Sequence, residues 1–205
     1  MNETARARSE LYGLFAELLS FPTEQLAEAC NAGDVERSLT AIASVLPFTF
    51  QDGLAGALTD PGLGHVDLQS EYIRLFDLPG GGPSMPLYAG VFAPSRRDSM
   101  EELLRFYRHF GLTVSTDERD LPDAIPTVLE FLHFLSFREA SLAVDEDAAP
   151  LHGAQADVLG RHLVRWTTEA ASRIEGKDAM PFYRSVIHLL NEFCGQELQL
   201  LQAAA

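Results

Sequence analysis

Apolar side chains recur at helical spacing along most of the chain. Residues 5–19 form one such stripe on a single helical face, made of Ala7, Leu11, Leu14, Phe15 and Leu18. Comparable stripes follow in the ranges 65–76, 98–110, 159–174 and 183–201. The run after Pro122 is apolar on nearly all sides, which predicts the most buried helix. Because no segment alternates apolar and polar residues for long, the pattern predicts an all-α, single globular helical domain of about eight to ten helices.

Start and stop signals suggest where several helices begin and end. Pro22 can open the second helix at its first position. Asp34 is suited to cap a helix that runs to about Val45, and a weaker helix is expected over 48–58. Asp98 is suited to cap the helix that Gly111 stops.

A long loop interrupts the helical pattern near the middle of the chain. The stretch "DLPGGGPSMPLYAGVF", residues 77–92, has three prolines and four glycines but also the large apolar residues Met85, Leu87, Tyr88, Val91 and Phe92. Such loops are usually functional when they are ordered. Two interpretations stay open: the loop walls a peptide groove between the helix ending at Phe76 and the one starting near Asp98, or it is a strap covering the core. We expect one domain over 1–205, with 1–60 and 65–205 as its possible halves.

The charge balance narrows the class of partner. The 30 acidic and 15 basic residues give a formal net charge of −15. That charge disfavours nucleic acid and anionic lipid, and it favours basic partners. An acidic surface that keeps the protein in solution is the simpler alternative.

Two further features bear on location. No window approaches eighteen uninterrupted apolar residues, and the N-terminus "MNETARARSELYGLF" lacks the pattern of a secretory signal. We therefore expect no membrane span and a cytoplasmic location. Cys30 and Cys194 have no partner at metal or redox spacing, so both are predicted to be buried small apolar residues.

The residues show little sign of catalysis. No His pair has metal-ligand spacing, and Gly80–Gly82 precedes no Lys-Ser or Lys-Thr that a phosphate loop would need. A small helical enzyme would need His133, Glu130 and Asp123 to converge in a pocket. The sequence thus favours a non-enzyme without a metal site. Arg96-Arg97 is expected to cap the loop or to pair with acids on a neighbouring helix.

Four stretches carry a family resemblance. They are "EYIRLFDLPGGGPSMPLYAGVF" (71–92), "MEELLRFYRHFGL" (100–112), "DLPDAIPTVLEFLHFL" (120–135) and "HLVRWTTEAASRIEGKDAMPFYRSVIHLLNEF" (162–193). In this order and spacing, the sequence resembles the TorD/DmsD/NarJ family of redox-enzyme maturation chaperones. It looks closest to the branch that serves type II molybdoenzymes of the dimethyl sulfoxide reductase family.

The resemblance implies an all-helical cytoplasmic chaperone with no catalysis and no cofactor of its own. Its partner would be the apo catalytic molybdopterin subunit of such an enzyme, bound in many family members through a basic twin-arginine leader peptide. The chaperone would hold this subunit until the molybdenum cofactor is inserted, and a transient contact with that cofactor stays open. Monomer and dimer both stay open, and a passive helical adaptor is the alternative function.

The resemblance also implies which residues bind the peptide: Tyr72, Phe76, Pro86, Tyr88 and Asp123. Phe92 joins them because it lies in the same apolar loop. The usual family triplet Pro-Asp-His stands here as Pro122-Asp123-Ala124, so a histidine often implicated in recognition is missing.

Overall fold

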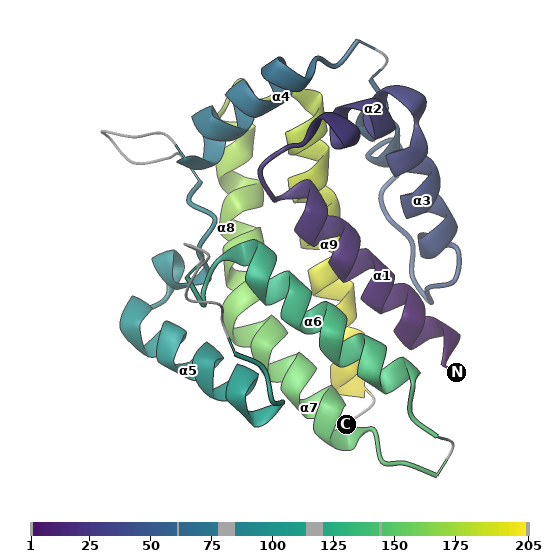
Figure 1. Cartoon of the computed structure of the whole chain (residues 1–205), viewed down its shortest axis with the longest axis vertical. Helices are drawn as coiled ribbons and strands as arrows, with labels where there is room; N and C mark the ends of the chain where they lie inside the picture. The colour runs from purple at the N-terminus through teal and green to yellow at the C-terminus, as the bar shows by residue number, and fades with distance from the viewer. Residues whose placement is uncertain (1, 61, 78–84, 114–120, 144, 204–205) are drawn as a thin grey trace.

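The chain folds into an all-helical structure, which this computed structural model describes for residues 2–60, 62–77, 85–113, 121–143 and 145–203 (Figure 1). The α-helices of these ranges are α1 (Glu3–Leu18), α2 (Glu24–Ala32), α3 (Asp34–Ala43), α4 (His65–Tyr72), α5 (Arg96–His109), α6 (Ile125–Ala140), α7 (Ala149–Val158), α8 (Val164–Glu175) and α9 (Pro181–Ala203). Short 3-10 turns lie at Ala55–Leu58 and Ala89–Phe92, and π-helical turns at Ile73–Asp77 and Leu159–Leu163. The predicted all-α fold class is confirmed.

Two helix pairs enclose the core. α1 and α6 run side by side and cross over α8 and α9, while α2, α3 and α4 gather at one end (Figure 1). The largest fully buried side chains include Tyr12, Phe15, Trp166, Tyr183 and Phe193. The Phe193 ring lies 4.8 Å from Tyr12 and 5.8 Å from Phe15, which joins α9 to α1. Aromatic pairs at such distances stabilise a core beyond the area that they bury.

A buried ionic cluster also holds α1 to its neighbours. Arg8 donates to Glu197 on α9 (2.6 Å), to both oxygens of Glu139 on α6 (3.0 Å each) and to Gln155 on α7 (2.6 Å). Both ion-pair partners of Arg8 have side chains at most 4% exposed. One arginine therefore joins four helices through their buried sides.

The pKa values of the two carboxylates in this cluster are shifted in opposite directions. Burial would raise the pKa of Glu139, but the charge of Arg8 and hydrogen bonds from Gln155 and His152 outweigh it, so this pKa lies below its ordinary value. For Glu197, burial prevails over Arg8 and raises the pKa.

Several predicted helix boundaries were wrong. Pro22 does not open α2, because Thr23 caps that helix by accepting a hydrogen bond from the Leu26 N–H (3.2 Å). Asp34 is the first residue of α3 rather than its cap. Gly33, with φ 72°, ends α2 and begins α3 in a left-handed conformation that suits glycine.

Two further predictions for helices need correction. The helix expected over 48–58 is absent apart from the single 3-10 turn Ala55–Leu58. The helix expected to start at Asp98 begins two residues earlier, since the Ser95 hydroxyl accepts the hydrogen bond of the Asp98 N–H (3.3 Å). α6 is buried along much of its length, but Phe137 on its outer side is 56% exposed.

The sequence pattern missed α7 altogether. This helix follows the acidic turn 145–147 and continues through the π-helical turn Leu159–Leu163 into α8. Both predicted buried cysteines, Cys30 and Cys194, are free thiols inside the core. None of the helices in the described ranges combines the length and apolar character needed to span a bilayer.

Candidate functional site

The described half of the central loop is packed against the helices. We call residues 85–92 the strap. The Met85 N–H donates to the Leu75 carbonyl (3.0 Å), and the Trp166 indole N–H donates to the Pro86 carbonyl (2.8 Å). Leu87 accepts from the Ile125 N–H at the start of α6 (2.9 Å). The strap is therefore fixed at successive residues, while residues 78–84, including Gly80–Gly82, lie outside the described part of the chain.

One candidate residue lies at a polar corner beneath the strap. Asp123 is 0% exposed and accepts hydrogen bonds from the Gly90 N–H (3.3 Å) and from Arg96 Nε (3.1 Å). The Arg96 guanidinium also lies 4.6 Å from the centre of the Tyr88 ring, a cation–π distance. We call Tyr88, Gly90, Arg96 and Asp123 the Asp123 corner. Arg96 thus pairs with an acid that precedes α6 and does not lie on a helix, whereas Arg97 pairs with Glu101 of its own helix (2.8 Å), so the expected pairing with acids on a neighbouring helix was wrong.

Ala124, which stands at the position of the usual family histidine, pairs with the strap through its backbone. Tyr88 and Ala124 form an isolated antiparallel bridge, in which the Ala89 N–H donates to the Asp123 carbonyl (2.8 Å). Nearby, the Tyr107 hydroxyl donates to the Pro122 carbonyl (2.8 Å). Burial, aided by the charge of Asp123, raises the pKa of Tyr107, so the phenol stays protonated as this donor requires. The start of α6 is thus held by the strap and by α5 together.

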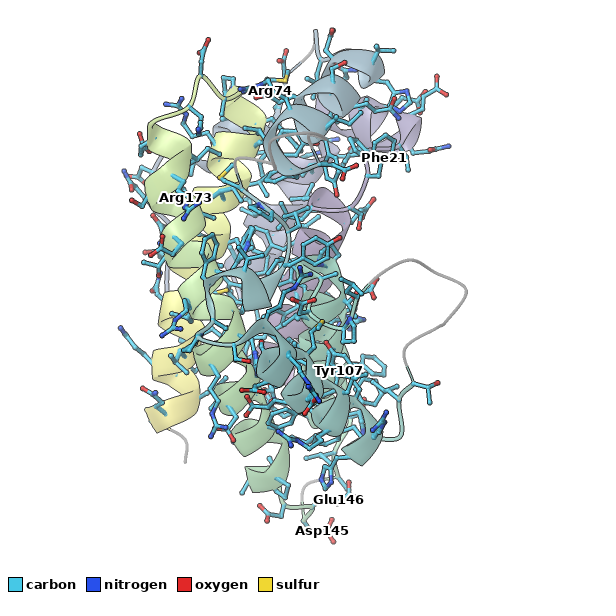
Figure 2. The ribbon with its side chains drawn as sticks, turned by 90° about the vertical axis from the view of Figure 1, so that its left-hand side faces the viewer. Phe21, Arg74, Tyr107, Asp145, Glu146 and Arg173 are labelled. Atoms are coloured by element: carbon cyan, nitrogen blue, oxygen red, sulfur yellow. The ribbon has the colours of Figure 1, made fainter. Side chains whose placement is uncertain are left out.

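Tyr72 and Phe76 lie in an aromatic cluster at the other end of the strap. The Tyr72 ring is 5.2 Å from Phe76 and 5.5 Å from Phe21, and Phe76 is 5.4 Å from Tyr183. The Tyr72 hydroxyl donates to the Leu19 carbonyl (3.2 Å). Phe21 is 52% exposed, so the cluster reaches the surface there (Figure 2).

Phe92 ends the strap against α8. The Arg173 guanidinium lies 4.6 Å from the centre of its ring, and Arg165 donates to its carbonyl (3.1 Å). Both arginines come from α8, so Phe92 holds a face of that helix to the strap.

The candidate residues therefore fall into two groups by accessibility. Tyr72, Pro86, Tyr88 and Phe92 are partly exposed, and a peptide on the surface can contact them. Phe76 and Asp123 are buried, so in this conformation they position other side chains and do not meet a partner directly. Sequence motifs alone did not separate these two roles.

The enzyme hypothesis finds no support in the geometry. His133 Nδ1 lies 2.8 Å from the Ser9 carbonyl oxygen. The His133 ring also packs against Gly13, since a Cβ added to that glycine would lie 3.4 Å from Nδ1. Asp123 precedes α6, whereas His133 lies roughly 12 Å further along that helix at its rise per residue. Asp123 is occupied by Arg96 and Gly90 instead. Asp123 and His133 therefore do not converge as that hypothesis requires.

Comparisons with known proteins identify relatives over most of the chain. A family model described as the nitrate reductase delta subunit matches residues 28–172. The chlorate reductase assembly chaperone protein of Ideonella dechloratans is 43% identical over 124 residues, which is 59% of this chain and 64% of that protein. The selenate reductase assembly chaperone protein of Thauera selenatis is 40% identical over 60% of this chain and 65% of its own length. The matched part thus spans just under two thirds of each of these two relatives.

A third relative matches nearly end to end. The perchlorate reductase assembly chaperone protein of Dechloromonas aromatica is 30% identical over 94% of this chain and 89% of its own length. A crystal structure of a proposed redox enzyme maturation protein from Archaeoglobus fulgidus has a TM-score of 0.50 at 21% identity and covers 95% of this chain and 93% of that one. At that identity the likeness shows the fold alone.

Fold and relatives together define an all-helical protein of the redox-enzyme maturation class. This confirms the resemblance to the TorD/DmsD/NarJ chaperones that the sequence motifs carry. The chain belongs to the nitrate reductase delta subunit family.

Proposed function

We propose that this protein is a cytoplasmic chaperone for the apo catalytic subunit of a molybdenum oxidoreductase of the dimethyl sulfoxide reductase family. It binds that subunit, assists insertion of the molybdenum cofactor and assembly, and releases it before export. It performs no catalysis and holds no cofactor of its own. The observation that carries this proposal is the match to the perchlorate reductase assembly chaperone protein over 94% of this chain.

The client's basic leader is the part most suited to this surface. A net charge of −15 attracts a basic peptide and speeds its encounter with the protein. Exposed ion pairs contribute only about 0.2–1 kcal/mol each, so the contact must also bury apolar side chains. For the client as a whole, the partly exposed rings of Tyr72, Tyr88 and Phe92 offer such area on and beside the strap.

Co-purification from the native host is the experiment that tests the function. The tagged protein is recovered after anaerobic growth, and its partners are identified by mass spectrometry. A molybdopterin-containing catalytic subunit that still carries its leader is the expected result. Repeated recovery of no such subunit would contradict the chaperone function. Recovery of the subunit with no effect of the chaperone on its molybdenum content would instead indicate a passive adaptor.

Substitutions on the strap test how the client is bound. Tyr88→Ser and Phe92→Ser should weaken client capture more than they lower the melting temperature, because both rings are only partly buried. Phe137→Ser is a matched control, since Phe137 is an exposed aromatic residue on the outer side of α6. Equal losses of binding and stability in the strap variants would show that the strap only covers the core.

A further inference from the structure

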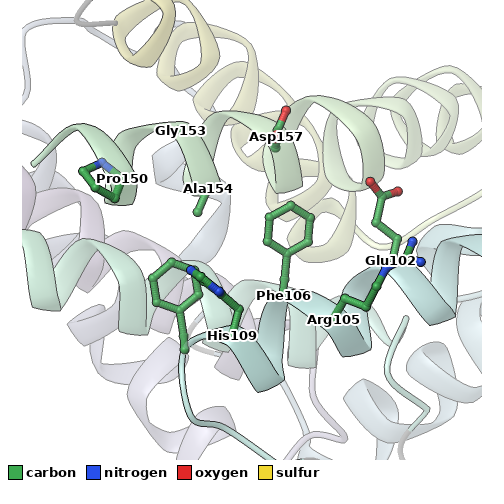
Figure 3. A pocket seen from close by; sticks show the side chains of 9 residues that line it. Glu102, Arg105, Phe106, His109, Pro150, Gly153, Ala154 and Asp157 are labelled. Carbon is green, nitrogen blue, oxygen red and sulfur yellow. The ribbon is translucent and has the colours of Figure 1, made fainter.

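A cleft with a volume of about 540 Å³ lies between α5 and α7, away from the strap (Figure 3). Its apolar lining comes from Phe106 on α5, from Phe110 just after that helix, and from Pro150 and Ala154 on α7. Figure 3 shows Phe106 projecting from α5 toward α7. A cleft of this size and composition is typical of a binding site for apolar groups.

Ion pairs close one end of the cleft. Arg161 donates to Glu102 on α5 (2.6 Å) and lies 3.1 Å from Asp157 on α7. Behind this bridge, the Ser99 hydroxyl lies 3.0 Å from Nδ1 of the buried His162. The two carboxylates at this end thus already share one cation of the same chain.

The other end of the cleft adjoins unneutralised negative charge. Pro150 lies there, three residues after the exposed turn Asp145–Glu146–Asp147. Glu146 and Asp147 accept hydrogen bonds from backbone N–H groups of Ala143 (2.7 Å) and Ala149 (2.9 Å). Within the described ranges none of the three carboxylates takes part in an ion pair. Figure 2 shows Asp145 and Glu146 at the tip of one end of the molecule.

We infer that this cleft binds an extended peptide in which arginines adjoin a short apolar run. The apolar side chains lie between Phe106 and Ala154, and the arginines meet the turn Asp145–Asp147. Because α5 contributes Arg105 and His109 to the rim, the arginines of the bound peptide lie away from α5 and toward α7. A second copy of this chain is a poorer occupant, since two molecules of charge −15 repel each other.

This inference rests on the proposed function and adds a location to it. It assigns the leader's apolar run to the α5–α7 cleft, and leaves Tyr88 and the Asp123 corner for other parts of the client. The two surfaces are joined through α5, whose N-terminal Arg96 pairs with Asp123 and whose C-terminal half lines the cleft.

Two glycines give a matched pair of variants. Gly153 in α7 and Gly195 in α9 both lie inside helices, and a Cβ added to either would meet nothing within 4 Å. Gly153→Phe places a ring in the cleft, whereas Gly195→Phe adds the same ring elsewhere. Both changes remove a helix-interior glycine, so both should be tolerated by the fold. Gly153→Leu is a smaller second variant, and thermal melting shows which proteins are folded.

The probe is a fluorescein-labelled synthetic peptide with two adjacent arginines followed by a run of leucine, alanine and phenylalanine. Its binding to the full chain is measured by fluorescence anisotropy. Gly153→Phe should raise Kd at least tenfold, and Gly195→Phe should leave Kd within twofold of the wild type. Asp145→Asn combined with Glu146→Gln should raise Kd about two- to fivefold at low salt, with the difference lost at high salt.

The remaining outcomes separate this inference from the proposed function. Unchanged binding in folded Gly153→Phe, with loss in Tyr88→Ser, would overturn the cleft and keep a leader-binding chaperone. No peptide binding by the wild type, with the catalytic subunit still co-purified, would overturn the cleft and point to the mature body of the client. Loss of both peptide binding and co-purification would refute the proposed function itself.

Discussion

Replacing Arg8 by methionine should destabilise the protein severely. The substitution keeps an unbranched side chain of similar length but removes the cation from the ionic cluster. Glu139 would keep its contacts with Gln155 (2.9 Å) and His152 (3.0 Å). Glu197 would keep only the Tyr12 hydroxyl at 3.3 Å among its described hydrogen bonds. Two buried carboxylates would thus be left without their counter-charge.

Breaking a buried ion pair from one side costs about 3–5 kcal/mol. For a chain of 205 residues, each kcal/mol lowers the melting temperature by roughly 2–4 °C, so a fall of about 6–20 °C is expected. Arg6→Met is the matched control on the same helix. Arg6 pairs with Glu10 at 2.8 Å, but both side chains are exposed, so this change should cost about 0.5 kcal/mol or less.

The assay is thermal unfolding followed by circular dichroism at 222 nm, repeated between pH 7.5 and pH 5. Removing Arg8 takes away the charge that lowers the pKa of both carboxylates, so both folded-state values rise, and that of Glu197 rises further above its ordinary value. Stability that depends on their protonated forms is present at low pH and is lost as pH rises through the folded pKa. The gap between wild type and Arg8→Met should therefore narrow toward pH 5. A loss no larger than that of Arg6→Met, or a gap independent of pH, would refute this reasoning.

Two further predictions concern the Asp123 corner and the loss of stability at acid pH. In Gly90→Ala the new Cβ would lie 2.7 Å from Arg96 Cγ and 2.8 Å from Asp123 Oδ2. This overpacking should lower the free energy of unfolding, measured in urea, by about 1–3 kcal/mol. A variant as stable as the wild type would contradict this geometry of the Asp123 corner. The pKa values of Glu71 and Glu139 both lie below the ordinary 4.5, since burial is outweighed by their arginine partners and further hydrogen bonds. Their stabilisation is complete above that value and is lost as pH falls through the lower folded pKa, so the melting temperature should drop below about pH 4.5. Glu71→Gln should make that drop smaller. A drop as large as that of the wild type would show that Glu71 does not contribute to it.

Helices with a strong apolar stripe were predictable from the sequence, and those without one were not. α1 and α9 carry large apolar residues at helical spacing, and the structure has both. α7 was missed because small residues such as Gly153 and Ala154 weaken its stripe. The helix expected over 48–58 is absent. Instead, tertiary contacts hold this segment to α9: the Gln51 N–H donates to Glu192 (2.8 Å), and Gln196 donates to the Thr49 carbonyl (3.0 Å).

The site was predictable as a set of motifs but not as a surface. The family motifs include Tyr88 and Asp123, and the structure places both at one corner. The sequence does not show that Asp123 is covered, because its burial depends on Arg96 and on the backbone of Gly90. Arg6 and Arg8 illustrate the same limit: two arginines on one helix differ in role only because their neighbours come from distant segments.

The π-helical turn between α7 and α8 sets the rotational phase of the second helix. Such a turn accommodates one residue more than an α-helix would, and one residue corresponds to about 100° around a helix axis. If the same residues of Leu159–Leu163 were wound as an ordinary α-helix, with none removed, α8 would be turned by about that angle relative to α7. Trp166 would face away from the Pro86 carbonyl that its indole N–H now meets at 2.8 Å. Where the strap attaches thus depends on one wide turn in a helix some eighty positions further along the chain.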